Sequence, residues 1–215
     1  MLLPGIQHGL VRGRPPLPLT TAYLNSDMIS ASGSSFTFSN RAIGAADATR
    51  HIFVTVGAGG FRAQLVTSVT VAGEAATPVT TGIYYAKVPA GSNATIVVTT
   101  SEAVVSCAIG LFRVVGAPSM DVFQSNSLQT TGSFAFSAGT LEEGEAAISL
   151  VGYDDDEGFP AFSWNDMAQA WSRDLLLGAT YRGALATTPG SYTGGYSLSS
   201  GYSARHSRCF IRGAY

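Results

Sequence analysis

The sequence contains few charged residues. Only 12% of its 215 residues are Asp, Glu, Lys or Arg, whereas a typical soluble domain has about a quarter. Eleven of the twelve basic residues are arginines, and they form no basic run with interleaved aromatic residues, so the sequence does not predict nucleic-acid binding. A surface so poor in charge favours a chain whose neighbours cover much of it. Ser and Thr hydroxyls that keep a free chain soluble are the alternative.

Cysteine and histidine are also scarce. Cys107 and Cys209 lie in apolar, strand-like contexts. Two cysteines are too few for a disulfide scaffold, and their spacing does not suit a metal site, so we expect two small buried hydrophobic residues. The three histidines are His8, His51 and His206, and none accompanies a nucleophile motif. The sequence therefore predicts no metal, no cofactor and no enzyme.

Long hydrophobic runs are absent as well. No window approaches the ~18 apolar residues that a membrane-spanning helix needs. The N-terminus starts with apolar residues, but Pro4, Gly5, Gln7 and His8 interrupt the core that a signal peptide requires. We therefore expect neither membrane insertion nor export by a standard signal.

Residues 1–25 differ from the rest of the chain. Four prolines within this segment disfavour helix and sheet, which predicts an extended arm. The arm is too apolar for a solvated linker, and we expect it to dock on another subunit, with packing against its own domain as the alternative. The residues expected to contact the partner are Leu2, Leu3, Ile6, Leu10, Leu17 and Leu19.

From residue 34 onward the pattern is typical of β-strands. "SFTFS" at 35–39 alternates between polar and apolar residues, and "HIFVTVG" at 51–57 reads as a buried strand. Ala72-Gly73-Glu74 predicts a tight turn between two strands. The segment 164–179 is ambiguous, because its apolar spacing suits either a short helix or a strand with a long loop.

Three motifs recur in the same order. "SFAFS" at 133–137 repeats "SFTFS" after 98 residues, Pro189 follows Pro89 after 100, and Cys209 follows Cys107 after 102. This recurrence predicts an internal duplication, with quasi-repeated halves at about 34–116 and 132–215. We expect an all-β, jelly-roll-like antiparallel β-sandwich over residues 26–215, built from two Greek-key-like halves that share one core. Two separate small sandwiches are the alternative.

The acidic residues suggest little chemistry. Asp154, Asp155, Asp156 and Glu157 are consecutive, and consecutive residues of a strand point to opposite sides. We therefore expect a solvated loop here, although a bound cation remains the alternative. A glycosidase would need two carboxylates facing each other in a cleft, and Glu142, Glu143 and the residues at 154–157 are candidates only because they are acidic.

The aromatic residues near the C-terminus offer a binding alternative. Tyr192, Tyr196 and Tyr202 lie in a segment rich in Gly and Ser. Tyrosine faces beside hydroxyl groups suit sugar stacking or contact with a partner protein. The competing interpretation is that these rings pack over glycine-rich strands.

The first half resembles a known group of proteins. Its "SFTFSNRAIGAADATRHIFVTV", "SVTVAGEAATPV", "IYYAKVPAGSNATIVVTTS" and "SCAIGLFRVVG" are similar to β-rich structural proteins of tailed bacteriophages and prophages. The resemblance covers residues 34–116 clearly, 133–215 loosely and 1–25 not at all. Its motifs are structural, so it implies no functional residue.

This resemblance implies a component of the virion. The expected roles are a head decoration, a vertex spike or a tail-associated subunit, made in the host cytoplasm and anchored to other virion proteins by residues 1–25. A homo-oligomer is expected, because virion proteins use exposed strand edges in symmetric contacts. The alternative function is a carbohydrate-binding or host-adhesion module that recognises a surface glycan through its Tyr and Trp side chains.

Overall fold

The chain folds almost entirely into antiparallel β-strands. A computed structural model describes residues 17–59, 63–154, 161–175, 179–199 and 202–214. The strand pairings in these ranges are antiparallel, and the helical element described is the short 3-10 helix η1 (Ala63–Leu65). The expected all-β antiparallel sandwich is therefore confirmed. Within the same ranges, no helix is long and apolar enough to span a membrane.

The first half has the strand order of a complete jelly roll. Its two sheets have the orders β1-β9-β3-β7-β6 and β2-β8-β4-β5. The strands β5 and β6 act as one strand that changes sheet at Ala76, so the first half has eight strands distributed between two sheets in the order of a jelly roll. The bounds are β1 Thr20–Ile29, β2 Gly33–Ala42, β3 His51–Ala58, β4 Val66–Val71, β5 Glu74–Ala75, β6 Thr77–Thr80, β7 Ile83–Lys87, β8 Asn93–Val104 and β9 Cys107–Val115.

The second half repeats this order with a reduced outer sheet. Its large sheet runs β10-β18-β12-β15-β14, and the outer sheet is represented by the short pairs β11-β16 and β13-β17. The ambiguous segment from residue 164 forms the end of β13 and the strand β14, so its described part is strand. The bounds are β10 Ser119–Thr131, β11 Gly139–Leu141, β12 Ala146–Asp154, β13 Phe162–Trp164, β14 Ala168–Leu175, β15 Ala179–Ala186, β16 Gly190–Tyr192, β17 Tyr196–Leu198 and β18 Ser203–Ala214.

Strand register supports the internal duplication. Thr20 pairs with Val115 in the first half and Ser119 pairs with Ala214 in the second, so both partners shift by 99 residues. Both β1 and β10 also have a β-bulge after their fourth residue. The large sheets of the two halves therefore share one register, but "SFAFS" does not repeat the strand that "SFTFS" forms in β2, because residues 133–137 lie between β10 and β11 with an isolated β-bridge at Phe134.

The cysteines do not occupy equivalent positions. Because β9 and β18 are offset by 99 residues, the counterpart of Cys107 is His206, and the expected offset of 102 is wrong by three. An odd shift moves a side chain to the other face of a strand. Cys107 accordingly lies in the core between the two sheets of the first half, whereas Cys209 lies in the core between the halves. Both thiols are free and buried.

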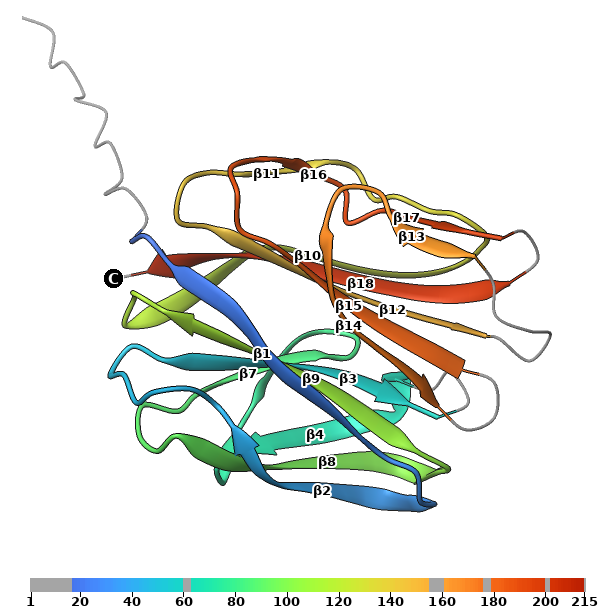
Figure 1. Ribbon diagram of the computed structural model, residues 1–215, viewed down its shortest axis with the longest axis horizontal. Helices are drawn as coiled ribbons and strands as arrows, with labels where there is room; N and C mark the ends of the chain where they lie inside the picture. Colours follow the sequence, from blue (N-terminus) through green and yellow to red (C-terminus); the bar gives the residue numbers. More distant parts are fainter. Residues whose placement is uncertain (1–16, 60–62, 155–160, 176–178, 200–201, 215) are drawn as a thin grey trace, which may run out of the picture.

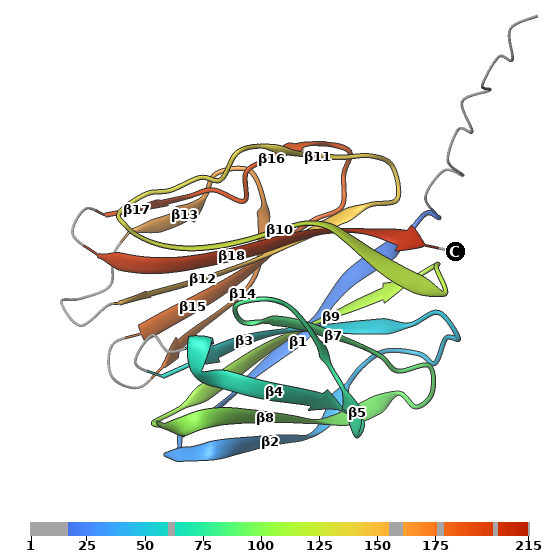
Figure 2. The same ribbon diagram turned by 180° about the vertical axis from the view of Figure 1, so that it is seen from behind.

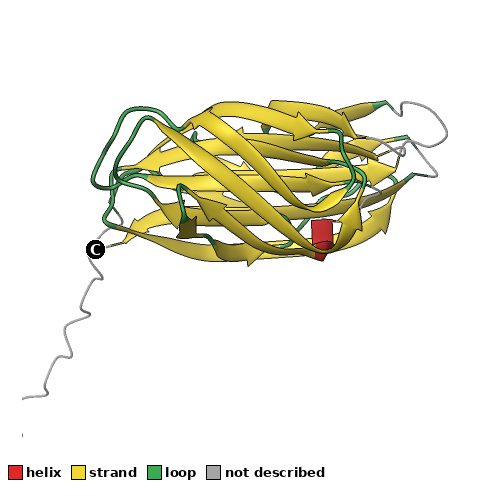
Figure 3. Cartoon of the chain, turned by 90° about the horizontal axis from the view of Figure 1, so that it is seen from below, coloured by secondary structure: helices red, strands yellow, loops and turns green. Residues whose placement is uncertain are grey.

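The two halves stack face to face. Figures 1 and 2 show the outer sheet of the first half, the two five-stranded sheets and the short strands of the second half as successive layers. Hydrophobic residues of both five-stranded sheets, including Phe53, Phe112 and Ile148, form one continuous core. Because both faces of its sheet are covered, every residue of β3 is buried. Most strands run roughly along the long axis of the molecule (Figure 3).

The stacking is reciprocal. Strand β1 lies beside β14, and β6 lies beside β10. The duplication makes β10 the counterpart of β1 and β14 the counterpart of β6, so exchanging the halves maps each contact onto the other. The chain thus resembles a twofold dimer whose two protomers have been joined covalently.

Trp171 of β14 contributes to the interface between the two halves. Its indole nitrogen donates a 3.2 Å hydrogen bond to the hydroxyl of Thr55 in the first half. A Cβ at Gly110 or at Gly183 would collide with the indole ring, so glycine at both positions makes room for it. Tyr181 of β15 also forms a hydrogen bond between the halves, since its hydroxyl donates to the Ala58 carbonyl at 3.1 Å.

The first described residues belong to the sandwich. Leu17 forms a β-bridge with Gly213, and the Leu19 amide donates a 2.7 Å hydrogen bond to the Gly144 carbonyl. Strand β1 begins at Thr20. The predicted arm boundary at residue 25 is therefore wrong, because residues 17–25 pack on this same chain. The remaining predicted contact residues, Leu2, Leu3, Ile6 and Leu10, lie outside the described residues.

Candidate functional site

The three large sheets end in edge strands whose backbone groups can pair with another chain. The edges are β1 and β6 in one sheet, β10 and β14 in the second, and β2 and β5 in the third. How each edge is protected decides which one is available for binding.

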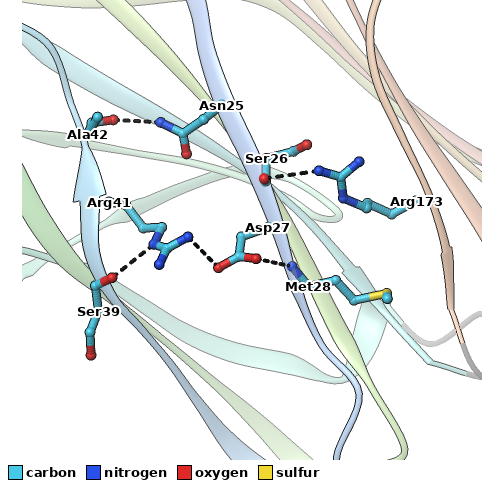
Figure 4. A network of polar contacts seen from close by, with 8 residues as sticks. All are labelled: Asn25, Ser26, Asp27, Met28, Ser39, Arg41, Ala42 and Arg173. Carbon is cyan, nitrogen blue, oxygen red and sulfur yellow. Dashed lines mark hydrogen bonds and ion pairs between the residues drawn. The ribbon is translucent and has the colours of Figure 1, made fainter.

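Side chains cap the edge of β1. Arg173 of β14 donates a 3.1 Å hydrogen bond to the Ser26 carbonyl. Asp27 accepts the Met28 amide at 2.9 Å and forms a 2.6 Å ion pair with Arg41 of β2 (Figure 4). Because both partners are about one-third exposed, this ion pair adds little stability. Its structural effect is to join β1 to its neighbours.

The same network caps β2. The Asn25 amide group donates a 2.7 Å hydrogen bond to the Ala42 carbonyl, and the Arg41 Nε donates a 2.9 Å hydrogen bond to the Ser39 carbonyl (Figure 4). Strands from three different layers are thereby tied together along one side of the molecule.

Other devices protect three further edges. Strand β6 contains Pro78, which has no amide hydrogen to donate to an added strand. In β14, Arg173 donates a 2.9 Å hydrogen bond to the Ser172 carbonyl. Strand β5 has only two residues. Each of these edges offers a poor template for pairing.

Strand β10 has none of these protections. It is 13 residues long and contains neither proline nor glycine. Its single charged residue, Asp121, is paired with Arg212 of β18 at 2.8 Å. Within the described part of the chain, no hydrogen bond reaches the β10 backbone from the side away from β18. Its Leu128 is 45% exposed, so this strand combines an open edge with an exposed apolar side chain.

Strand β10 was not among the binding residues predicted from the sequence. The sequence feature that could have identified it as an open edge is the uncharged run "VFQSNSLQTT" at 122–131. Such a run is unusual for an edge that must resist pairing. The side chains that cap the other edges could not be identified, because Asp27, Arg41 and Arg173 meet only in the folded chain.

A cluster of buried polar and aromatic groups surrounds His206. The imidazole is fully buried, and neither ring nitrogen has a hydrogen-bond partner. The rings of Phe136 and Tyr196 lie with their centroids 4.6 and 5.3 Å from it. Burial, helped by the nearby charge of Arg208, lowers the pKa of His206 to about 3. The imidazole is therefore neutral, and its burial keeps it from meeting a substrate.

Two buried arginines tie loops together. The Arg50 guanidinium donates to six backbone carbonyls in the segments 43–45 and 88–91. Arg208 bonds to the carbonyls of Ser137, Tyr192 and Thr193 and stacks on Phe136. These contacts satisfy both charges within the fold, so neither arginine is offered to a ligand.

The three predicted tyrosines do not form an exposed face. Tyr196 is fully buried, so its assignment to a binding face is wrong. Tyr192 packs against the cluster that contains Phe210, and Tyr202 packs against a different cluster around Val151. The competing interpretation, that tyrosine rings pack within the glycine-rich C-terminal part, describes Tyr196 correctly.

The acidic residues do not converge in the described part of the chain. Glu142 and Glu143 are exposed in the turn before β12, where the Glu145 carboxylate caps the Glu142 amide at 2.9 Å. No group of potential metal ligands occurs among the described residues. Asp154 ends β12, and the residues at 155–157 lie outside the described ranges.

A shallow depression beside β13 and β17 is lined by Ala161, Phe162, Ser163, Ser197, Leu198 and Ser199.

Comparisons with known proteins identify no family. No protein-family model matches the sequence, and no curated protein matches it. Among solved structures, a conserved protein of unknown function from Pseudomonas aeruginosa PAO1 is similar, with 14% identity and a TM-score of 0.33. The match covers 89% of this chain and 78% of that protein.

Proposed function

We propose that this chain is a structural subunit of a tailed-phage virion, placed as a head decoration, a vertex spike or a tail-associated component. The observation that carries the proposal is the unprotected edge of β10 on a sandwich whose other described edges are capped by side chains, contain proline or are very short. A protein that must stay free in solution protects every long edge. One that is assembled permanently can keep an edge for its neighbour.

Two further features support this role. The low charge of the chain suits a surface that neighbouring subunits cover. The halves are joined by a continuous core and by the hydrogen bonds of Trp171 and Tyr181, which gives a rigid body for fixed contacts. The carbohydrate-binding alternative is weakened, because Tyr196 cannot stack on a glycan from the core.

The proposal is tested by following the chain into particles. Phage particles purified by density gradient from cells that carry the gene should contain the chain in a fixed ratio to the major capsid or tail protein. The same fraction from cells carrying a disrupted gene is the control. Purified particles that lack the chain would overturn the proposal.

Residues 1–16 are the segment to remove when anchoring is tested. A variant lacking 1–16 retains Leu17, Leu19 and the whole of β1, so it should fold, which thermal melting checks. We expect this variant to be depleted from purified particles. Incorporation equal to that of the full chain would show that anchoring does not use these residues.

A further inference from the structure

We propose that β10 pairs antiparallel with β10 of a second copy of this chain across a twofold axis, joining two five-stranded sheets into one. This inference deepens the proposed structural role and rests on it for its biological setting. It can nevertheless be tested on the purified chain alone. The partner is a second copy, and the contact is the strand edge.

The available edge is well defined. After its bulge, β10 pairs with β18 without a further register shift from Gln124 to Thr131. In an antiparallel strand, alternate residues direct their N–H and C=O groups to opposite sides. Half of these residues therefore present donors and acceptors away from β18. The side-chain bonds of Asn126, Ser127 and Gln129 go to β18 and leave that outer edge uncovered.

The chemistry of the strand favours its own copy as the partner. No residue from 122 to 131 is charged, so antiparallel self-pairing sets no like charges opposite each other. Asp121 lies before the bulge and is occupied by Arg212. A pairing centred beside Leu128 brings the two exposed leucine side chains together on one face of the joined sheet, where they remove each other from water.

A twofold contact is also closed. Two copies that pair through the same edge consume both open edges, so the sheet cannot continue to grow. The outer edges of the joined sheet are then the two β14 strands, which Arg173 caps. Open-ended aggregation is thereby avoided.

The first experiment changes the centre of the edge. Leu128→Lys places two like charges against each other at the axis, and we expect the dimer dissociation constant to rise at least about tenfold. Thr37→Lys introduces the same charge at an exposed position of the capped strand β2 and should leave dimerisation unchanged. Sedimentation equilibrium of the full chain and both variants measures the constants, and thermal melting confirms that each variant is folded.

The second experiment locates the contact by disulfide formation. Cys107 and Cys209 are buried with a pKa of about 12, so an introduced cysteine is the thiol that reacts. Ser127→Cys or Leu128→Cys should give a covalent dimer under mild oxidation, since one of the two positions faces its copy near the axis. Ser119→Cys, exposed at the far end of β10, is the control and should remain uncrosslinked.

The outcomes separate this inference from the proposed function. A chain that stays monomeric at about 100 µM and crosslinks equally at Ser119, Ser127 and Leu128 overturns β10 pairing, even if the chain is found in virions. A dimer that loses affinity with Leu128→Lys but is absent from purified particles supports β10 pairing and overturns the virion role. Dimerisation that Thr37→Lys weakens as much as Leu128→Lys also overturns the assignment to β10.

Discussion

Single buried residues use their polarity to join segments of this chain. The Arg50 guanidinium donates hydrogen bonds to six carbonyls in two loops, and Arg208 of β18 donates hydrogen bonds to three. Hydrogen bonds from a charged donor contribute about 1.5–3 kcal/mol each, and removing a buried partner leaves acceptors unsatisfied. The few charges of the chain are thus placed partly inside it, which could not be predicted because the carbonyls come from distant segments.

His206 should make stability depend on pH. Its folded pKa is about 3, below the unfolded value of about 6.5, so between these values the unfolded chain binds a proton that the folded chain does not. The free energy of unfolding should therefore be fully retained above about pH 6.5 and fall as the pH is lowered towards 3. Urea titrations at several pH values measure this slope.

Variants assign the slope to its source. His206→Gln removes the titrating group and should flatten the profile. His51, whose pKa burial also lowers, is the matched site, and His51→Gln should leave most of the slope in place. A profile that His206→Gln does not change would contradict the assignment.

Strands with a clear pattern were predictable, and strands that depend on distant partners were not. The apolar run of β3 and the turn at Ala72 and Gly73, where both residues have positive φ, agree with the sequence analysis. The segment from Trp164 remained ambiguous, because Trp171 faces a neighbouring sheet whose position the sequence does not reveal. The cysteine register was wrong for a similar reason, since β9 and the middle of β18 are buried on both faces and show no regular alternation of polar and apolar residues.

The fit of Trp171 between two glycines gives a prediction for the stacked sheets. Gly183→Ala places a methyl group against the indole ring and should reduce the free energy of unfolding by about 1–3 kcal/mol, as overpacking does. Gly33→Ala is the control, because the nearest atom to its added Cβ is 3.8 Å away. Urea unfolding followed by tryptophan fluorescence measures both variants. Equal stability of Gly183→Ala and the unmodified chain would show that the indole can move aside.

At the scale of the whole molecule, the two halves are joined by a hydrophobic core to which both five-stranded sheets contribute. Each half has its own jelly-roll order, yet its large sheet carries a second apolar face that the other half covers. Residues such as Phe53, Ile83 and Phe112 are fully buried by this stacking. The sequence predicted two halves with one core, with two separate small sandwiches as the alternative, and the structure combines features of both, because each half has its own pair of sheets and the halves also share a core.

When the two halves are produced as separate chains, each should therefore depend on binding to the other for its stability. Residues 17–116 and 117–214 produced together as two chains should copurify as a one-to-one complex, because each covers the other's exposed apolar face. Trp171→Ala in the second piece should weaken the complex, since a truncated core tryptophan costs about 3–5 kcal/mol. Size-exclusion chromatography with light scattering measures the assembly. Two pieces that each remain folded and monomeric alone would contradict this view.

The bridge between Leu17 and Gly213 has a practical consequence. Both ends of the described chain leave the sandwich at the same pole. A tag or epitope joined directly to Leu17 or to Ala214 would project from that pole. A short peptide linking the two ends would permit circular permutation, with new termini opened in a surface turn such as the one at Gly73.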